Sequence, residues 1–399
     1  MGNETKVKTF LKERVKLNSA IIGVGNAGNQ FVNTAFAEGH EMIFAVNTSE
    51  RDLSDENLNQ NIPAFLVGDE ARGAGQNRQK AKELFQYNGK QLFSIPRFQD
   101  CVQAADIVYV TGSTDGGSGS GIAPEIVKLL SLIYPQKIII YYGSLPKLST
   151  PTPNTHKNMI ECLNEINTLN VPYMLADLSF YEDVDNHIAY KQIAKHIITS
   201  IDIIGGKYLN TTIGDSIDEN DMRTVVSEPG YLATYILDKI TTTQIEKESI
   251  QSMMVKLINH SPAATIQKDR IIKQIGVISN CPSDMMETSK TGNYSELTNF
   301  IGIPRGIFKN EALTQSNVGQ FMTILSGMSL PYNRILKASA IIEQNEEALR
   351  RKKTIDLSGE MSKLDFLNDS TTKNKLVNSK NINPTNMDEV LGDFFDSKK

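Results

Sequence analysis

Short apolar runs alternate with segments of helical periodicity over roughly the first 180 residues of the chain. The apolar runs lie at residues 19–24, 42–46, 107–111, 137–142 and 172–175. Between them, residues 29–38 and 123–132 repeat apolar positions at the spacing that is typical of amphipathic helices. A run that is apolar throughout suits a strand buried on both faces. This part of the chain therefore predicts an α/β fold with a doubly wound, Rossmann-like parallel sheet.

The rest of the chain has fewer glycine turns and a mixed pattern. Residues 184–204 show helical spacing over a length that predicts a helix linking two domains, and residues 331–353 predict a second long helix. Residues 223–227 predict a helix that continues beyond Pro229. Strands are predicted at residues 253–258, 275–278 and 319–325. This mixture predicts a smaller α+β domain.

These patterns define the domain organisation that we predict. It comprises a polar or helical leader (residues 1–18), an α/β domain (19–183), a core linking helix (184–210), an α+β second domain (211–330), a C-terminal helix (331–353) and a flexible tail (354–399). The tail is rich in Asn, Ser, Thr, Lys and Asp, a composition that buries too little apolar surface to fold alone. Its last residues, 387–399, combine acidic and aromatic side chains. This end either binds a partner or serves only to keep the chain soluble.

Charge and cysteine usage exclude several classes of protein. The 399 residues carry a formal net charge of −5 and include three widely separated cysteines and five histidines. Because no basic block dominates, we expect no direct binding to nucleic acid. The cysteines favour reduced thiols and a cytoplasmic location, and no uncharged apolar run is long enough to span a membrane. The histidines and cysteines have no metal-ligand spacing, so we expect no protein metal site.

The first glycine motif follows the first predicted strand. Residues 23–28 match G-x-G-x-x-G between a strand and a helix, where backbone N–H groups and the helix dipole bind phosphate. A dinucleotide site would need an acidic residue at the end of the second strand, but the chain has Asn47, Thr48 and Ser49 there. An NAD(P)-binding enzyme therefore remains the less favoured alternative.

A second and a third glycine loop strengthen the case for an anionic ligand. Residues 115–121 consist almost entirely of small residues, so consecutive amides can surround an anion at a helix N-terminus. Ile122 stands where a Walker P-loop requires Lys. A further glycine turn lies at residues 72–77. Three such loops at one edge of a parallel sheet predict a long anionic ligand such as a nucleoside triphosphate.

Together these loops resemble those of the tubulin/FtsZ superfamily. The matching segments are Gly-Val-Gly-Asn-Ala-Gly-Asn-Gln at 23–30, Val-Asn-Thr at 46–48, Arg-Gly-Ala-Gly at 72–75 and Gly-Gly-Ser-Gly-Ser-Gly at 116–121. The resemblance implies a GTPase that binds GTP with Mg²⁺ and polymerises with itself, head to tail. The nucleotide contacts that it implies are Gly25, Asn26, Ala27, Gly28, Asn29, Asn47, Gly73, Ala74, Gly75, Gly116, Gly117, Ser118, Gly119, Ser120, Gly121 and, on the core helix, Lys191.

The segment from residue 218 to residue 225 resembles the loop by which one subunit of this superfamily completes the nucleotide site of the next. The resemblance implies that Asp218 and Asp221 are catalytic and polarise the attacking water. From the residues alone, the favoured interpretation is a helix N-cap at Asp218, with Asp221 in the first helical turn; the resemblance favours catalysis. Asp115 departs from the family, because it replaces the first glycine of the signature loop. A carboxylate there either faces magnesium, turns away or weakens nucleotide binding.

Within the superfamily the chain resembles the TubZ group of plasmid and phage partition tubulins. The similar segments are Leu-Pro-Lys at 145–147, Ser-Gly-Met-Ser-Leu-Pro at 326–331 and Asp-Phe-Phe at 393–395. The resemblance implies movement of plasmid or phage DNA, with a DNA-binding adaptor of the TubR type that binds the C-terminal tail. The alternative is a nucleotide-binding scaffold that polymerises with little or no turnover, which Asp115 favours.

Overall fold

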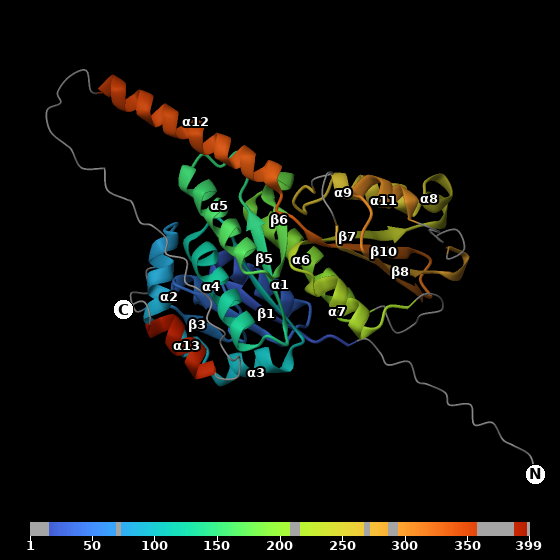
Figure 1. Cartoon of the computed structure of the whole chain (residues 1–399), viewed down its shortest axis with the longest axis horizontal. Coiled ribbons are helices and arrows are strands. Elements are labelled where there is room, and N and C mark those ends of the chain that lie inside the picture. The colour runs from blue at the N-terminus through green and yellow to red at the C-terminus, as the bar shows by residue number, and fades with distance from the viewer. Residues whose placement is uncertain are drawn as a thin grey trace, which may run out of the picture.

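In the described part of the chain, ten strands form a single mixed sheet that runs through the molecule (Figure 1). The computed structural model describes residues 16–68, 73–207, 216–266, 272–285, 294–356 and 387–396. In order across the sheet, the strands are β3 (Ala64–Leu66), β2 (Ile43–Asn47), β1 (Ser19–Val24), β4 (Ile107–Ser113), β5 (Ile138–Leu145), β6 (Pro172–Asp177), β7 (Gly230–Ile240), β10 (Gly319–Met328), β8 (Gln274–Cys281) and β9 (Gly306–Leu313).

The predicted doubly wound parallel sheet is confirmed. All pairings among β1 to β6 are parallel, and neighbouring residues of one strand enter different cores: Ile21 belongs to one buried cluster and Ile22 to the other. The helices of this half are α1 (Gly25–Ala37), α2 (Arg78–Leu92), α3 (Pro96–Ala104), α4 (Gly117–Ile133) and α5 (Pro153–Thr168). Because the strands are parallel, their carboxyl ends and the glycine loops that follow lie at one edge of the sheet.

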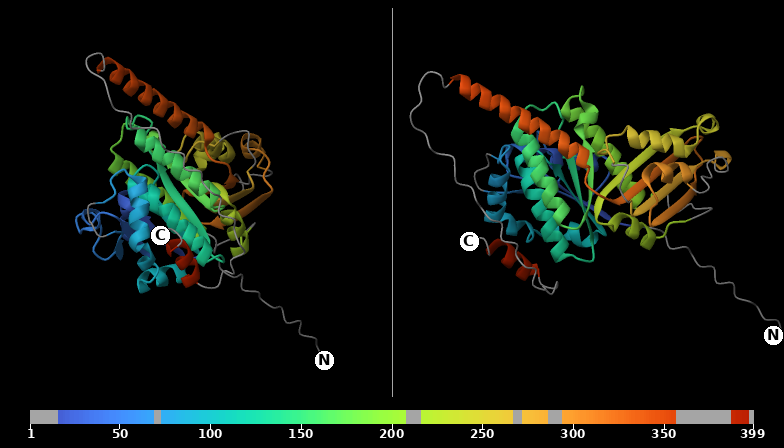
Figure 2. Two further views of the ribbon diagram at one scale, coloured as in Figure 1. Left: turned by 60° about the vertical axis from the view of Figure 1, so that its left-hand side comes forward. Right: turned by 45° about the horizontal axis from the view of Figure 1, so that its top comes forward.

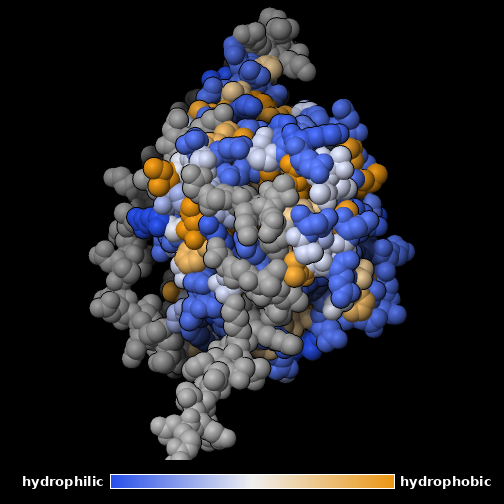
Figure 3. All heavy atoms as spheres, turned by 90° about the vertical axis from the view of Figure 1, so that its right-hand side faces the viewer, coloured by the Kyte–Doolittle hydropathy of each residue, from blue (hydrophilic) through white to orange (hydrophobic). Residues whose placement is uncertain are grey.

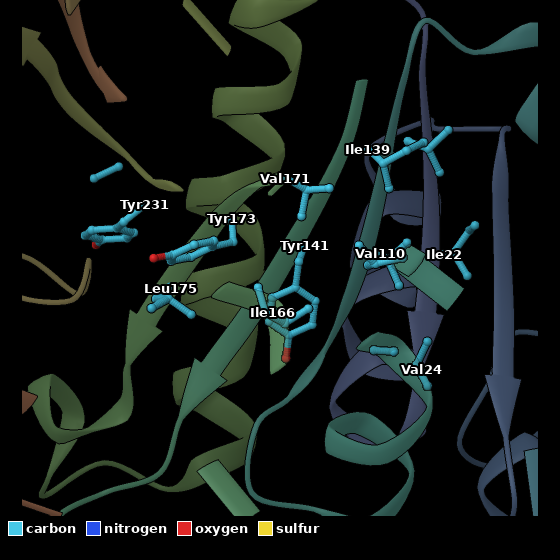
Figure 4. Close-up of a cluster of buried hydrophobic side chains, with 14 of the residues drawn as sticks. Ile22, Val24, Val110, Ile139, Tyr141, Ile166, Val171, Tyr173, Leu175 and Tyr231 are labelled. Atoms are coloured by element: carbon cyan, nitrogen blue, oxygen red, sulfur yellow. The ribbon is translucent and has the colours of Figure 1, made fainter. Parts of the chain in front are cut away.

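The strands of the second half continue the same sheet. Strand β7 pairs in parallel with β6, where Tyr173 lies beside Tyr231. The two rings are stacked with centroids 6.1 Å apart, and Figure 4 shows them with Tyr141 in the buried layer between strands and helices. The predicted second domain is therefore joined to the first by both backbone pairing and aromatic packing. The domain boundaries given above remain predictions.

Helix α6 (Asn186–Ile204) connects the two edges of the sheet. It packs against α1 and β7, and its buried Ser200 hydroxyl lies 2.9 Å from the Thr234 hydroxyl. At 1.5 Å per residue its 19 residues span about 28 Å. After its last turn, the Gly205 carbonyl accepts a hydrogen bond from the amide of Leu17, just before β1 begins. The helix thus ends at the amino edge of the parallel strands.

Two sequence predictions in the second half are wrong. Residues 253–258 are not a strand but part of α9 (Ile250–Asn259), which Ser249 caps by accepting a hydrogen bond from the Ser252 amide. A short apolar run cannot by itself distinguish a strand from a buried helix. The helix α7 (Glu219–Ser227) does not continue beyond Pro229, because β7 follows. The remaining helices here are α8 (Thr242–Lys247) and α11 (Ser295–Ile301).

The face of the molecule that lies on the right in Figure 1 is mostly hydrophilic, with apolar residues in small groups (Figure 3). Within the described residues, no helix is both long enough and apolar enough to cross a membrane.

Two C-terminal helices pack on the first half (Figure 2). Helix α12 (Tyr332–Asp356) lies on α5, close to the predicted bounds, and α13 (Met387–Asp396) lies against α2 and α4. The prediction of a flexible tail is therefore wrong for residues 387–396, which find apolar partners on the domain surface. Of the predicted leader, only residues 16–18 are among the described residues.

A buried ion pair attaches the start of α12 to the sheet. Arg334 is 5% exposed; its Nε lies 2.7 Å from Asp177 Oδ2, and its guanidinium also donates to the Pro146 carbonyl. We expect Arg334→Ala to lower the free energy of unfolding by about 3 kcal/mol, because it leaves a largely buried carboxylate without its cation. Urea unfolding followed by circular dichroism measures the change. Lys157→Ala removes an exposed ion pair between α5 and α12 and is the control, for which an equal loss would contradict the argument.

Candidate functional site

A pocket of about 340 Å³ opens where the glycine loops meet, a volume within the usual range for small-molecule sites. It is lined by Gly25, Asn26, Ala27, Gln30, Asn47, Thr48, Ser49, Asp52, Gly73, Ala74, Gly75, Ser113, Asp115, Gly116, Gly117, Ser118, Gly119 and Tyr190. The three loops that the sequence singled out thus come together at the carboxyl edge of the parallel strands.

Two helices begin at this pocket with the features of an anion site. The N-cap residues Val24 of α1 and Gly116 of α4 make no side-chain capping bond, and neither first turn contains an acidic residue. First-turn N–H groups have no partner within their own helix, and the N-terminus carries a partial positive charge. Both helix starts therefore favour a negatively charged ligand in the pocket.

Glycine is required where the loops touch one another. Gly25 has φ +73°, and a Cβ there would lie 3.1 Å from the Gly119 amide nitrogen. A Cβ on Gly117 would lie 2.3 Å from the Gly75 carbonyl oxygen, which already accepts a hydrogen bond from the Gly117 amide at 3.0 Å. Side chains at these positions would force the loops apart and change the shape of the pocket.

Thr48 connects two of the loops and was not among the predicted contacts. Its Oγ1 accepts a hydrogen bond from the Ala74 amide at 2.9 Å and lies 2.7 Å from the Ser118 hydroxyl. The Asn47 side chain, which does line the pocket, accepts hydrogen bonds from the amides of Thr48 and Ser49 and so shapes this turn. The Val-Asn-Thr motif in the sequence contained this signal.

On α6 the structure brings Tyr190 to the pocket in place of Lys191. Lys191 is exposed and does not line the pocket. Successive helical residues point about 100° apart, so a shift of one position in the alignment changes which side chain faces inward. Burial raises the pKa of the Tyr190 phenol, which keeps the ring neutral. Gln30 and Asp52 are two further lining residues that the sequence did not indicate.

Four predicted contacts lie behind the pocket wall: Gly28, Asn29, Ser120 and Gly121. The fully buried Asn29 donates a hydrogen bond from Nδ2 to the Asp52 carbonyl at 2.7 Å. A Cβ on Gly28 would lie 2.6 Å from the Gly23 carbonyl carbon, so this glycine lets α1 approach β1. These residues support the loops and do not face the pocket.

Charged side chains fix the helices behind the pocket. The Arg78 Nε donates to the Ser120 carbonyl at 3.1 Å. Lys82 Nζ lies 2.7 Å from a Glu165 oxygen and 3.1 Å from a Glu125 oxygen. Because Lys82 belongs to α2, Glu125 to α4 and Glu165 to α5, this network holds the helices that carry two of the glycine loops.

Asp115 lines the pocket, and its own loop surrounds its carboxyl group. Burial raises the pKa of this carboxyl, although hydrogen bonds from the Ser113 hydroxyl and from the amides of Asp115 and Gly116 act in the opposite direction. The Asp115 carbonyl accepts a hydrogen bond from Asn158 Nδ2 at 2.9 Å, and the same Nδ2 lies 2.9 Å from the Gln76 carbonyl. The Asp115 side chain thus brings a carboxyl group to the wall of the pocket, beside the glycine loop.

The predicted catalytic pair, Asp218 and Asp221, does not line the pocket. The two form a capping box at the start of α7: Asp218 Oδ1 accepts from the Asp221 amide at 2.8 Å, and Asp221 Oδ2 accepts from the Asp218 amide at 3.2 Å. One turn later, Arg223 lies 2.6 Å from Asp106, immediately before β4. The pair therefore lies at the amino edge of the sheet, opposite the pocket.

Comparison with known proteins identifies relatives of this fold and site. Residues 18–170 match the model of the Tubulin/FtsZ family, GTPase domain. Over 384 residues the chain is 24% identical to the Tubulin-like protein TubZ of Clostridium botulinum C phage, an alignment that covers 93% of this chain and 96% of the relative.

Solved structures show the same fold. The crystal structure of Clostridium botulinum phage c-st TubZ superposes with a TM-score of 0.66 at 20% identity and covers 83% of this chain and 98% of the other. A GTPγS-form protofilament of Bacillus thuringiensis serovar israelensis TubZ gives a TM-score of 0.64 at 14% identity, covering 88% and 96%. The tubulin/FtsZ-like fold inferred from the glycine loops is confirmed.

Thr48 offers a test of how the pocket is built. We expect Thr48→Val to cost about 1–3 kcal/mol of unfolding free energy, because the Ala74 amide loses its acceptor. Hydrogen exchange should also become faster at residues 73–75. Thr48→Ser keeps the hydroxyl and is the matched control. Equal exchange in the Val and Ser variants would show that this hydroxyl does not hold the loop.

Proposed function

We propose that this chain, whose residues 18–170 match the model of the Tubulin/FtsZ family, GTPase domain, binds GTP in the pocket and assembles head to tail into filaments that activate its hydrolysis. The observation that carries the proposal is that the pocket and the acidic pair lie at opposite edges of one sheet. Neither can complete a hydrolytic site within one chain, but stacked copies bring the two edges together.

The pocket suits a nucleoside triphosphate. The helix starts of α1 and α4 would hold the phosphates through backbone amides, with Gly25, Gly117 and Gly119 letting the chain come close to them. Tyr190 would place an aromatic ring beside the base. The assignment of the nucleotide as GTP is supported by the match to the family model and by the similar structure described as a GTPγS-form protofilament.

Mg²⁺ would accompany the nucleotide and neutralise phosphate charge. Within the part of the chain that the structure describes, Asp52 and Asp115 are the two carboxylates that line the pocket and could hold it. Among the described residues, no three His, Cys, Asp or Glu side chains form a group that could hold a metal ion. Most ligands of the ion would therefore come from the phosphates and from water.

Hydrolysis would depend on the contact between subunits. Asp218 and Asp221 of one subunit would lie over the phosphates bound to the next, and their carboxylates would orient the attacking water. Each aspartate keeps one oxygen for the capping box, so the box would position the pair as well as begin the helix. A contact between unlike edges does not close on itself and produces a filament.

The cellular role that we propose is movement of plasmid or phage DNA through a DNA-binding adaptor of the TubR type. The resemblance to the TubZ group and the phage origin of a relative support it. The net charge of −5 supports an adaptor, since a chain of this charge lacks a broad basic surface for phosphate backbones.

Neutralising either aspartate should separate assembly from hydrolysis. Asn caps helices as well as Asp does at position 218, and at position 221 the amide oxygen of Asn can still accept the capping-box hydrogen bond, so Asp218→Asn and Asp221→Asn should fold and form filaments with GTP. We expect phosphate release to fall by about a hundredfold or more, because the water loses its anionic partner. Sedimentation and phosphate release, measured against protein concentration, test this. Unchanged turnover in both variants, or turnover in wild type with no concentration threshold, would contradict hydrolysis across the interface.

Mixing two inactive variants tests the shared site directly. Ala27→Glu adds a carboxylate to the phosphate pocket, where it should prevent nucleotide binding, yet an acidic first-turn residue is favourable to helix α1. In a mixture, the intact acidic pair of an Ala27→Glu subunit can meet the intact pocket of an Asp221→Asn subunit. The mixture should therefore recover part of the activity. Each variant mixed with itself is the control. No recovery, although the two variants sediment together, would argue against a shared site.

Asp115 should make nucleotide affinity depend on pH. The raised pKa means that the carboxyl becomes neutral on acidification sooner than an ordinary aspartate does, so GTP should bind more tightly as pH falls through that pKa. Asp115→Asn should bind GTP about tenfold more tightly than wild type at pH 8 in EDTA, since a like charge has been removed, and should lose this pH dependence. Titration calorimetry from pH 5 to 8 measures both. Weaker binding by the variant in EDTA would contradict the repulsion.

A further inference from the structure

Helix α13 buries one continuous apolar face. Val390, Leu391, Phe394 and Phe395 are 6%, 1%, 8% and 7% exposed. Their spacing places all four side chains on the same side of a helix. They belong to the large buried cluster that also contains Phe85 of α2 and Ile126 of α4. The C-terminal helix is thus part of the core of the first half of the molecule.

This face packs against α2 and α4, and the surface that these two helices present to it is called the groove below. Figures 1 and 2 show α13 beside these helices. The ring of Phe395 lies 5.7 Å from the ring of Phe85, measured between centroids. The ammonium group of Lys128, on α4, lies 5.3 Å from the centroid of the Phe394 ring, within the range of a cation–π contact. The two phenylalanines pack edge to face against each other at 4.9 Å. Phe395 therefore contacts α2 and Phe394 contacts α4, so each wall of the groove receives one aromatic ring.

The helix depends on the groove for its structure. An isolated helix of ten residues is marginal in water, because nucleation is unfavourable and few hydrogen bonds follow it. Segments of this kind fold as they bind, with apolar anchors one turn apart entering a groove on the partner. Helicity and docking of residues 387–396 should therefore be gained or lost together.

The groove is formed by α2 and α4, two of the helices that follow glycine loops. Helix α2 begins directly after the turn that contains Gly73 and Gly75, and α4 begins within the loop that contains Gly117 and Gly119. The loops contact each other through the Gly117 amide and the Gly75 carbonyl. A helix that packs on both α2 and α4 restrains their relative position, and with it this contact.

We propose that the groove between α2 and α4 is a docking site for an amphipathic acidic-aromatic helix, that α13 of the same chain is its occupant, and that docking stabilises the nucleotide pocket. The last part rests on the proposed function. By thermodynamic linkage, nucleotide binding should favour docking by the same factor by which docking favours nucleotide binding.

A single tryptophan can report on docking, because the chain contains none. In the full chain, Phe395→Trp should show blue-shifted emission and weak quenching by acrylamide. Tyr87→Trp, on the same helix pair but 71% exposed in the wild type, is the exposed control. Adding Leu391→Asp to Phe395→Trp should make its emission and quenching resemble those of the control. A fully quenchable Phe395→Trp without that second change would overturn the docking.

Two further measurements identify the occupant. Excess synthetic peptide with the sequence of residues 387–396 should displace the helix and red-shift the tryptophan of Phe395→Trp. The emission should not change on dilution, since docking within one chain is independent of concentration. Loss of the buried signal on dilution would overturn the assignment to the same chain in favour of exchange between copies.

The linkage is tested by GTP affinity. Leu391→Asp should weaken GTP binding about fivefold and accelerate hydrogen exchange in α2 and α4. Ile303→Asp makes a similar apolar-to-acidic change at a residue that is 87% exposed, and it should do neither. Unchanged GTP affinity in Leu391→Asp, with the helix released, would overturn the linkage and leave the proposed function intact. Absence of GTP binding in wild type would contradict the proposed function, while the tryptophan measurement would still decide docking.

Discussion

The close approach of glycine loops at one edge of the sheet is the constraint on which the rest of the molecule depends. The Gly117 amide donates to the Gly75 carbonyl, a Cβ on Gly25 would lie 3.1 Å from the Gly119 nitrogen, and a Cβ on Gly119 would lie 2.6 Å from the Ser113 carbonyl oxygen. This arrangement leaves backbone amides and two helix starts to form the wall of the pocket. The charged network of Lys82 and the buried Asn29 maintain it from behind the pocket wall, and the hydroxyl of Thr48 maintains it from within the wall.

A parallel sheet also separates functions in space. Its carboxyl edge carries the pocket, and its amino edge carries the start of α7, held there by the contact of Arg223 with Asp106. Helix α6 runs from Tyr190 at the first edge to Gly205 at the second, so the distance between the edges is set by a rigid element. Such a molecule has two unlike ends. In our proposal, chemistry that needs both ends can occur only where two copies meet, which couples hydrolysis to assembly.

The C-terminal helices add restraints on the same domain. Helix α12 is anchored by the buried pair of Arg334 and Asp177, and α13 fills the groove between the helices that carry the loops. Both contacts join residues far apart in sequence. The glycine loops are thus supported by segments that lie outside the α/β domain predicted from the sequence.

The sequence by itself determined the fold class, the edge of the sheet that carries the pocket and most of the lining residues, because parallel strands place their carboxyl ends, and the glycine loops that follow them, at one edge of the sheet. Only the tertiary structure decided which side chains face the pocket. Tyr190 replaces Lys191 because a helix turns about 100° per residue, and Thr48 acts through partners distant in sequence. The same holds for α9, whose short apolar run fits a strand or a helix until packing selects one. It holds for α13 as well, since its acidic-aromatic sequence is compatible with a soluble tail and becomes a helix only where α2 and α4 bury its apolar face.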